Sequence, residues 1–222
     1  MTETAAPLRI DIVSDVVCPW CIVGWRQLAA ALERTGTPAE IHWHPFELNP
    51  NMAPEGQNLR EHLAEKYGTS DADSAKARER LTAIGAELGF TFAYTDDMRM
   101  VNTFRAHQAI DWAETKGRAH EMKMALFAAF FTERRDVSDI DVLAELADGI
   151  GLDPAEARQV LEAGIFAEQV RQKEAFWTDR GLRGVPAVIF DRQHLATGAQ
   201  GIDRYEAMLR QLTGQVAGQG AG

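Results

Sequence analysis

The sequence is poor in cysteine, and the little it has lies in one place. Among 222 residues there are only two cysteines, Cys18 and Cys21, with Pro19 and Trp20 between them. Two cysteines cannot build the disulfide framework on which small secreted domains depend. A pair three positions apart indicates either a redox-active dithiol or part of a metal site.

The sequence also lacks an excess of positive charge and a long apolar run. Its formal net charge is −10, which argues against the basic surface that nucleic acids and anionic membranes require. The most apolar run, residues 125–131, is too short to span a bilayer. The first seven residues have neither the basic region nor the apolar region of a signal peptide. We therefore expect a cytoplasmic protein, in which a cysteine pair is more often catalytic or metal-binding than structural.

Apolar periodicity predicts two β-containing ends around a helical middle. The predicted strands are residues 8–13, 39–48, 186–190 and 194–197. The predicted helices are residues 19–36, 58–67, 70–88, 102–115, 118–132, 140–150, 154–163, 166–178 and 203–212. Neither end contains enough strands for a sheet of its own, so the two ends should meet in one sheet.

This order of elements predicts a discontinuous α/β domain. Residues 1–57 and 181–214 would form one sheet-containing domain, and residues 58–180 would be an all-helical insertion between the second and third strands. The tail at 215–222 is rich in glycine, alanine and glutamine, and we expect it to be disordered.

The position of the dithiol at a helix start predicts different roles for the two thiols. Pro19 suits the first helical position, which places Cys18 where unpaired backbone N–H groups and the helix dipole favour a thiolate. Such a position lowers a cysteine pKa from ~8.5 to between ~3.5 and ~7.5. Cys18 is therefore expected to attack a disulfide, and Cys21, one turn deeper, to resolve the mixed disulfide.

Other interpretations of the pair stay open at this point. The two cysteines could be inert buried thiols, a structural disulfide, or half of a zinc site completed by His42 and His44. The zinc interpretation is weakened because both histidines fall on the same face of one predicted strand and no second cysteine pair exists. We therefore predict a redox dithiol and no metal.

A proline at the start of the third predicted strand is the second feature of interest. A proline that opens a strand needs no special explanation. The sharper interpretation is a cis peptide bond between Val185 and Pro186, placed beside the dithiol. Such bonds make up only about 5–6% of X–Pro bonds, but the strand–dithiol–helix unit upstream favours one here.

The dithiol unit and the Val185–Pro186 strand start resemble the thioredoxin superfamily, and the helical insertion resembles its DsbA-like branch. Four stretches are similar to FrnE-like DsbA-family oxidoreductases: residues 11–21, 102–107, 184–186 and 198–200. The resemblance extends over about residues 8–212. It implies a thioredoxin-like α/β fold with a large all-helical insertion between the second and third strands, and thiol–disulfide oxidoreductase activity.

The resemblance also implies roles for individual residues. Cys18 would be the nucleophile, Cys21 the resolving thiol and Pro186 the cis-proline, while Val185 would offer its backbone to an extended substrate segment. No bound cofactor is implied, although glutathione could act as co-substrate. The expected partners are disulfide-containing proteins or small thiols, with no nucleic acid or membrane, and the protein would be a monomer or homodimer.

One position departs from the pattern of the relatives. Thioredoxin and DsbA carry a buried acid six residues before the first cysteine, where this sequence has Ile12. Asp11 and Asp15 lie nearby but are expected to face elsewhere, and Asp15 is predicted to be a solvated loop residue. The sequence therefore leaves the proton acceptor for Cys21 unassigned.

The segment 102–107 carries two further candidates. Asn102 is expected to cap a helix and His107 to be a core histidine. In the functional interpretation this segment lines the cleft over the dithiol, and Asn102 and His107 support the active site together with Pro19 and Trp20.

Two competing functions remain. A glutathione-dependent isomerase or transferase of the kappa type shares the inserted-helix architecture, but such enzymes typically have serine at the position of Cys18 and do not need Cys21. A non-enzymatic peptide-binding module is the other alternative, although no exposed apolar stripe in the sequence supports it.

Overall fold

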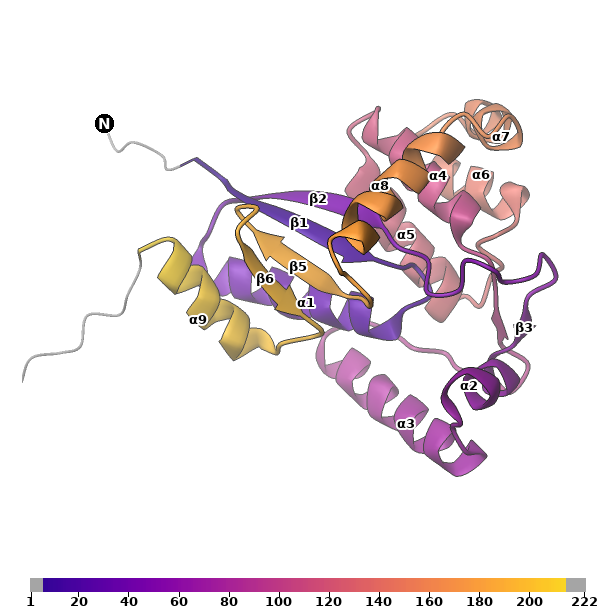
Figure 1. Cartoon of the computed structure of the whole chain (residues 1–222), viewed down its shortest axis with the longest axis horizontal. Helices are drawn as coiled ribbons and strands as arrows, with labels where there is room; N and C mark the ends of the chain where they lie inside the picture. The colour runs from indigo at the N-terminus through magenta and orange to yellow at the C-terminus, as the bar shows by residue number, and fades with distance from the viewer. Residues whose placement is uncertain (1–5, 215–222) are drawn as a thin grey trace, which may run out of the picture.

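In the computed structural model, which describes residues 6–214, the two ends of the chain share one four-stranded sheet (Figure 1). The central strand β1 (Leu8–Ser14) pairs in parallel with β2 (Ala39–Pro45) and antiparallel with β5 (Ala187–Phe190). β6 (His194–Thr197) pairs antiparallel with β5 and forms one edge. The predicted discontinuous sheet is confirmed, whereas the predicted tail at 215–222 lies outside the described residues.

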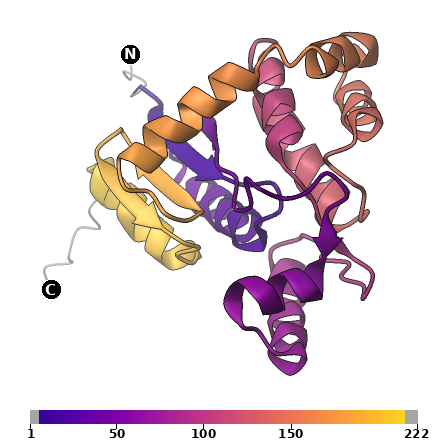
Figure 2. The same ribbon diagram turned by 45° about the vertical axis from the view of Figure 1, so that its right-hand side comes forward.

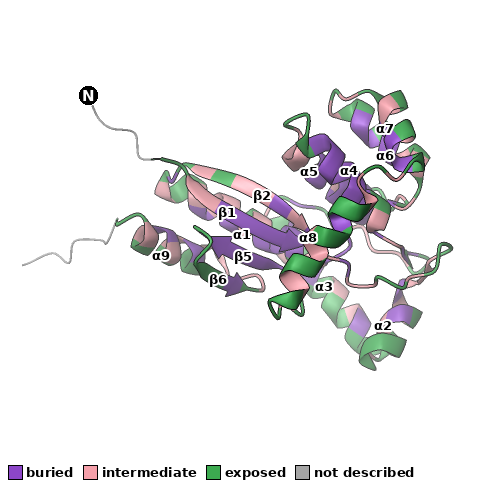
Figure 3. Ribbon diagram, turned by 45° about the horizontal axis from the view of Figure 1, so that its top comes forward, coloured by how far each residue is buried: buried purple, intermediate pink, exposed green. Residues whose placement is uncertain are grey.

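β1 lies in the centre of the sheet because it is apolar on both faces. Ile10 and Ile12 belong to the main core, which also contains residues of α1 (Pro19–Thr35) and α9 (Ile202–Leu212). Val13 points to the other face and packs in a separate cluster with Trp177 of α8 (Ala167–Asp179). Buried residues gather in β1 and β5 and in two helices of the insertion, α4 and α5 (Figure 3). Helices therefore cover both faces of the strand that leads to the dithiol.

The insertion between β2 and β5 separates into two groups of helices. Figures 1 and 2 show α2 and α3 at the bottom of the molecule and α4 to α8 at the top. The bounds not yet given are α2 (Leu59–Tyr67), α3 (Asp71–Glu87), α4 (Phe104–Glu114), α5 (Ala119–Phe131), α6 (Ile140–Gly149) and α7 (Pro154–Glu162).

The insertion also contains a short ribbon that the sequence did not predict. β3 (Gln57–Asn58) and β4 (Arg99–Met100) pair antiparallel, so the insertion is not entirely helical. Strands of two residues are too short to show an alternation of apolar and polar side chains. Within residues 6–214 no helix is long and apolar enough to cross a membrane.

Aromatic rings join α3 to α5. Phe92, in the segment after α3, has its ring centroid 4.9 Å from that of Phe90 and 5.1 Å from that of Phe131 at the end of α5. Gly85 of α3 lies so close to this cluster that a Cβ there would meet the Phe92 ring at 2.6 Å. This close approach fixes α3 against α5 and thereby shapes the space between α3 and the dithiol.

Candidate active site

Both cysteines lie at the N-terminal end of α1. Cys18 is the N-cap residue in extended conformation, and Pro19 occupies the first helical position, as predicted. The backbone N–H of Cys18 donates to the carbonyl of Asp15 at 3.2 Å, and that of Cys21 donates to the carbonyl of Cys18 at 3.1 Å. Both thiols are free and buried, Cys18 being 3% exposed and Cys21 1% exposed.

The Val185–Pro186 peptide bond is cis, as predicted, and it faces the dithiol. The Cys18 thiol donates to the carbonyl oxygen of Val185, with an Sγ–O distance of 3.7 Å. The ring of Pro186 packs on α1, where its Cγ would lie 3.4 Å from a Cβ at Gly24. The fold thus brings together the two motifs that the sequence places at opposite ends of the chain.

Asp15 is buried rather than solvated, so the prediction for this residue is wrong. One carboxylate oxygen accepts the backbone N–H of Leu48 at 2.7 Å, and the other lies 3.4 Å from Nε2 of the buried His107. Burial raises the pKa of Asp15, but His107, the Leu48 N–H and Lys123 outweigh burial and lower it. Sequence reasoning missed this because an aspartate in a loop is usually exposed.

Lys123 of α5 is a second buried charge near the thiols. Its side chain is 1% exposed, and its ammonium group donates to the carbonyl of Ser14 at 3.2 Å and lies 5.4 Å from the ring centre of Trp43. Burial lowers the pKa of Lys123 to about 8, while Cys21, Asp15 and Cys18 act to raise it. The site therefore contains a buried lysine as well as the buried Asp15.

The sequence contained a signal for Lys123 that periodicity analysis overlooks. The residue lies within α5, whose other inward positions are apolar, including Met122 and Leu126. A lysine on the buried face of such a helix is unusual, because lysine is almost never fully buried. A lysine at such a position indicates a buried ammonium group that neighbouring anions or aromatic rings must stabilise.

The pKa of Cys18 is raised well above its ordinary value, in contrast to the lowering that a helix start alone predicts. The hydrogen bond with the Cys21 thiol raises it most, and burial raises it further. Two thiols this close do not ionise together, because a second negative charge would lie beside the first. The neighbouring Cys21 thiol and burial therefore favour the protonated form of Cys18.

The remaining predicted site residues are Trp20, Asn102 and His107. Trp20 is 38% exposed, and the guanidinium of Arg80 lies 5.7 Å from its ring centre. Asn102 lies one residue before Thr103, the N-cap of α4, and its side-chain carbonyl accepts the backbone N–H of Phe104 at 2.9 Å. His107 approaches the loop before the dithiol at Asp15.

The two histidines considered as zinc ligands have other partners. Nε2 of His42 lies 3.0 Å from the carboxylate of Glu40, and Nε2 of His44 lies 2.8 Å from that of Asp11. Within the part of the chain that the structure describes, no three His, Cys, Asp or Glu side chains are grouped to hold a metal ion. Each of these histidines therefore lies beside a carboxylate of the sheet, Glu40 in β2 or Asp11 in β1.

Cys18 lines a pocket of about 360 Å³ between α1 and the α2–α3 pair. Val185 lines the same pocket, whereas Cys21 is not among its lining residues. The sulfur that a molecule in this pocket would meet is therefore that of Cys18.

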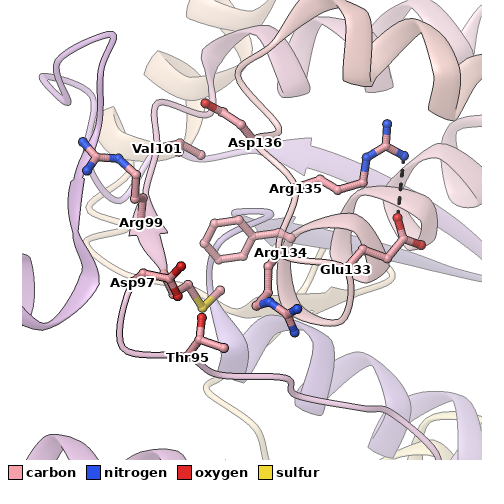
Figure 4. A pocket seen from close by; sticks show the side chains of 10 residues that line it. Thr95, Asp97, Arg99, Val101, Glu133, Arg134, Arg135 and Asp136 are labelled. Atoms are coloured by element: carbon pink, nitrogen blue, oxygen red, sulfur yellow. Dashed lines mark ion pairs between the residues drawn. The ribbon is translucent and has the colours of Figure 1, made fainter.

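A second pocket, of about 340 Å³, is lined by charged residues of both signs, including Arg99, Arg134 and Asp136 (Figure 4). Neither cysteine lines it, so it is separate from the dithiol. Its arginines include Arg135, which pairs with Glu133 at 3.6 Å.

Residues 9–210 match the family model described as a DSBA-like thioredoxin domain. The chain belongs to the DsbA-like thioredoxin family. This assignment agrees with the fold, in which a dithiol at a helix start faces a cis-proline and a helical insertion lies between β2 and β5.

Individual relatives cover nearly the whole chain. A Streptomyces coelicolor protein described as a probable DsbA oxidoreductase is 32% identical, with a TM-score of 0.86, over 97% of this chain and 94% of its own. The uncharacterized protein YwbO of Bacillus subtilis is 29% identical over 90% of this chain and 94% of its own. The cytosolic disulfide reductase DsbM of Pseudomonas aeruginosa, at 20% identity and a TM-score of 0.66 over 94% of this chain and 100% of its own, shares the fold.

Proposed function

We propose that this DsbA-like protein is a cytoplasmic thiol–disulfide oxidoreductase of the FrnE-like type. The observation that carries the proposal is the position of the Cys18 sulfur. It lies at a helix N-terminus, beside the Val185 carbonyl, and lines a pocket in which a substrate disulfide can approach it. Cys21 lies one turn deeper, where its sulfur can close onto Cys18.

The proposed exchange has two steps. The Cys18 thiolate attacks one sulfur of the substrate disulfide, forming a mixed disulfide and releasing the other half as a thiolate. Cys21 then attacks the Cys18 sulfur, which forms the Cys18–Cys21 disulfide, and its proton ends on the second half, which leaves as a thiol. The substrate gains two electrons and two protons, and the dithiol loses them.

A small thiol completes the proposed cycle. In the cytoplasm the glutathione pool keeps most dithiols reduced, which favours a reductase or isomerase role over oxidative folding. Reduced glutathione would then reverse the two steps and regenerate the dithiol. One relative with this fold, DsbM, is described as a cytosolic disulfide reductase and has also been solved with glutathione.

Equilibration with glutathione tests this proposal. Reduced protein is incubated with oxidised glutathione, the remaining thiols are alkylated, and intact mass is measured. We expect two hydrogens to be lost as the Cys18–Cys21 disulfide forms, with full recovery of both thiols after reduced glutathione is added. Two thiols that stay alkylatable under excess oxidant would contradict the proposal.

A further inference from the structure

The pocket beside Cys18 has an apolar body and several polar groups, which come from α2, from α3 and from connecting segments. The apolar lining includes Leu59, Leu63, Leu81, Met100, Phe130 and Phe131. The polar groups of interest are Ser74, Arg78 and Tyr94. Such an arrangement is typical of sites that bind a largely apolar small molecule and orient it through a few polar contacts.

Ser74 carries a buried polar group without a partner. The residue is 3% exposed and lines the pocket, and its hydroxyl oxygen forms no hydrogen bond with any other described residue. Buried hydroxyl groups almost always have a partner, so an orphan facing a pocket indicates a place for a ligand atom.

Arg78, one turn along α3 from Ser74, places a cation at the same pocket. Its side chain is 17% exposed, and its nearest acid, the exposed Asp96, lies 3.7 Å away. Its Nε donates to the carbonyl of Ser74 at a long 3.4 Å. The guanidinium is therefore incompletely paired and can bind a carboxylate through two parallel hydrogen bonds.

Tyr94 lies within electrostatic range of both the sulfur and the guanidinium. Burial and the nearby Cys18 raise the pKa of Tyr94, and Arg78 only partly opposes them. The phenol therefore stays protonated and can donate a hydrogen bond inside the pocket. Cys18, Arg78 and Tyr94 all line this one cavity.

We propose that the pocket binds a small organic disulfide with an apolar, ring-sized body and a carboxylate that contacts Arg78 and Ser74. This inference rests on the proposed exchange function and names its substrate class. A volume of about 360 Å³ holds a ring-sized group but not a folded domain. Cys18, only 3% exposed, is reached through this cavity rather than from a flat surface.

The reaction in the pocket follows the exchange already described. The Cys18 thiolate bonds to one sulfur of the bound disulfide, and the other half leaves as a thiolate. Cys21 releases the retained half as the Cys18–Cys21 disulfide forms. The substrate carboxylate that contacts Arg78 fixes which half of the disulfide remains in the pocket during the first step.

Binding without chemistry tests the inference directly. In protein carrying Cys18→Ser and Cys21→Ser, calorimetry measures the Kd for the aromatic carboxylate disulfide dithiobis-nitrobenzoate and for uncharged dithiodipyridine. We expect Arg78→Met to weaken binding of the first by about ten-fold or more, since a charged hydrogen-bonded pair is lost. Binding of dithiodipyridine should stay unchanged.

Arg60→Met is the matched control for this experiment. Arg60 also pairs with Asp96, at 3.4 Å, but it does not line the pocket. Arg60→Met should therefore leave both Kd values unchanged. If Arg60→Met weakens binding as much as Arg78→Met, or if oxidised glutathione binds as tightly as dithiobis-nitrobenzoate, the inference is wrong.

A second variant keeps the test decisive if Arg78→Met does not fold. Ala77, exposed at the rim of the pocket, can be replaced by leucine, which narrows the entrance. Ala77→Leu should weaken binding of both aromatic disulfides, and unchanged binding would contradict the proposed site. Wild-type protein that equilibrates with glutathione but binds neither probe would overturn this inference alone, whereas absence of any exchange would overturn the proposed function.

Discussion

Cys18→Ser is expected to lower the rate of disulfide exchange on the order of a thousand-fold, because serine cannot supply a thiolate. The Cys18 sulfur is the one that lines the pocket, and Cys21 is too deep to replace it. The measurement is the rate of insulin reduction, or of oxidised-glutathione reduction, by wild type and variant. The melting temperature should change little, since a serine hydroxyl can donate to the Val185 carbonyl as the thiol does.

The pH dependence of the same assay checks the state of the Cys18 thiol. Hydrogen bonding with Cys21 and burial raise the pKa of Cys18, so the thiolate fraction keeps increasing with pH beyond neutrality. The wild-type rate should therefore rise steadily between about pH 6 and about pH 9. A rate that reaches its plateau below pH 7 would show instead that the helix start dominates, as the sequence alone predicts.

Lys123→Met is expected to stabilise the protein at neutral pH by about 2 kcal/mol. Burial lowers the pKa of Lys123 from 10.5 to about 8, so the unfolded chain holds this proton more tightly than the folded protein. The destabilisation by the buried, charged lysine is fully present below pH 8. It disappears as pH rises toward the lysine pKa of the unfolded chain. Lost contacts with Ser14 and Trp43, and the lost attraction to the Asp15 carboxylate, reduce the gain from its limit of about 3 kcal/mol. Urea unfolding at pH 7 and at pH 10 measures the difference.

Lys173→Met is the matched control, and its effect should have the opposite sign. Burial lowers the pKa of Lys173, but the carboxylates of Glu114 and Asp111 outweigh burial and raise it. Removing the Lys173 ammonium leaves the charge of the buried Asp111 carboxylate less well compensated. The free energy of unfolding at pH 7 should therefore fall by about 1–2 kcal/mol. If both lysine variants change stability in the same direction, the account of Lys123 as a costly buried cation is wrong.

The sequence predicted the elements that have strong local signals. Pro19 and Gly36 mark the ends of α1 in the structure, as their backbone preferences require. The strand at His194–Thr197 lies where alternation placed it, and the helices of the insertion agree within a few residues. The cis bond before Pro186 was predictable because a second motif, the dithiol, raised its expected frequency.

The buried charges of the site could not be predicted in the same way. Asp15 has no local signal that distinguishes it from a solvated loop residue, and its partners Leu48 and His107 come from distant segments. Lys123 approaches the dithiol loop from α5, more than 100 residues along the chain. Tertiary packing decides such contacts, and no periodicity within a single element records them.

The most direct test of the central claim is to trap the first step of the reaction. Cys21→Ser protein is incubated with an excess of oxidised glutathione, and the adduct is located by peptide mapping. The account predicts a stable mixed disulfide on Cys18, with Cys21 in the Cys18→Ser protein modified far more slowly. A free Cys18 thiol in the first variant, or equally fast modification of Cys21 in the second, would contradict the assignment of Cys18 as the attacking sulfur.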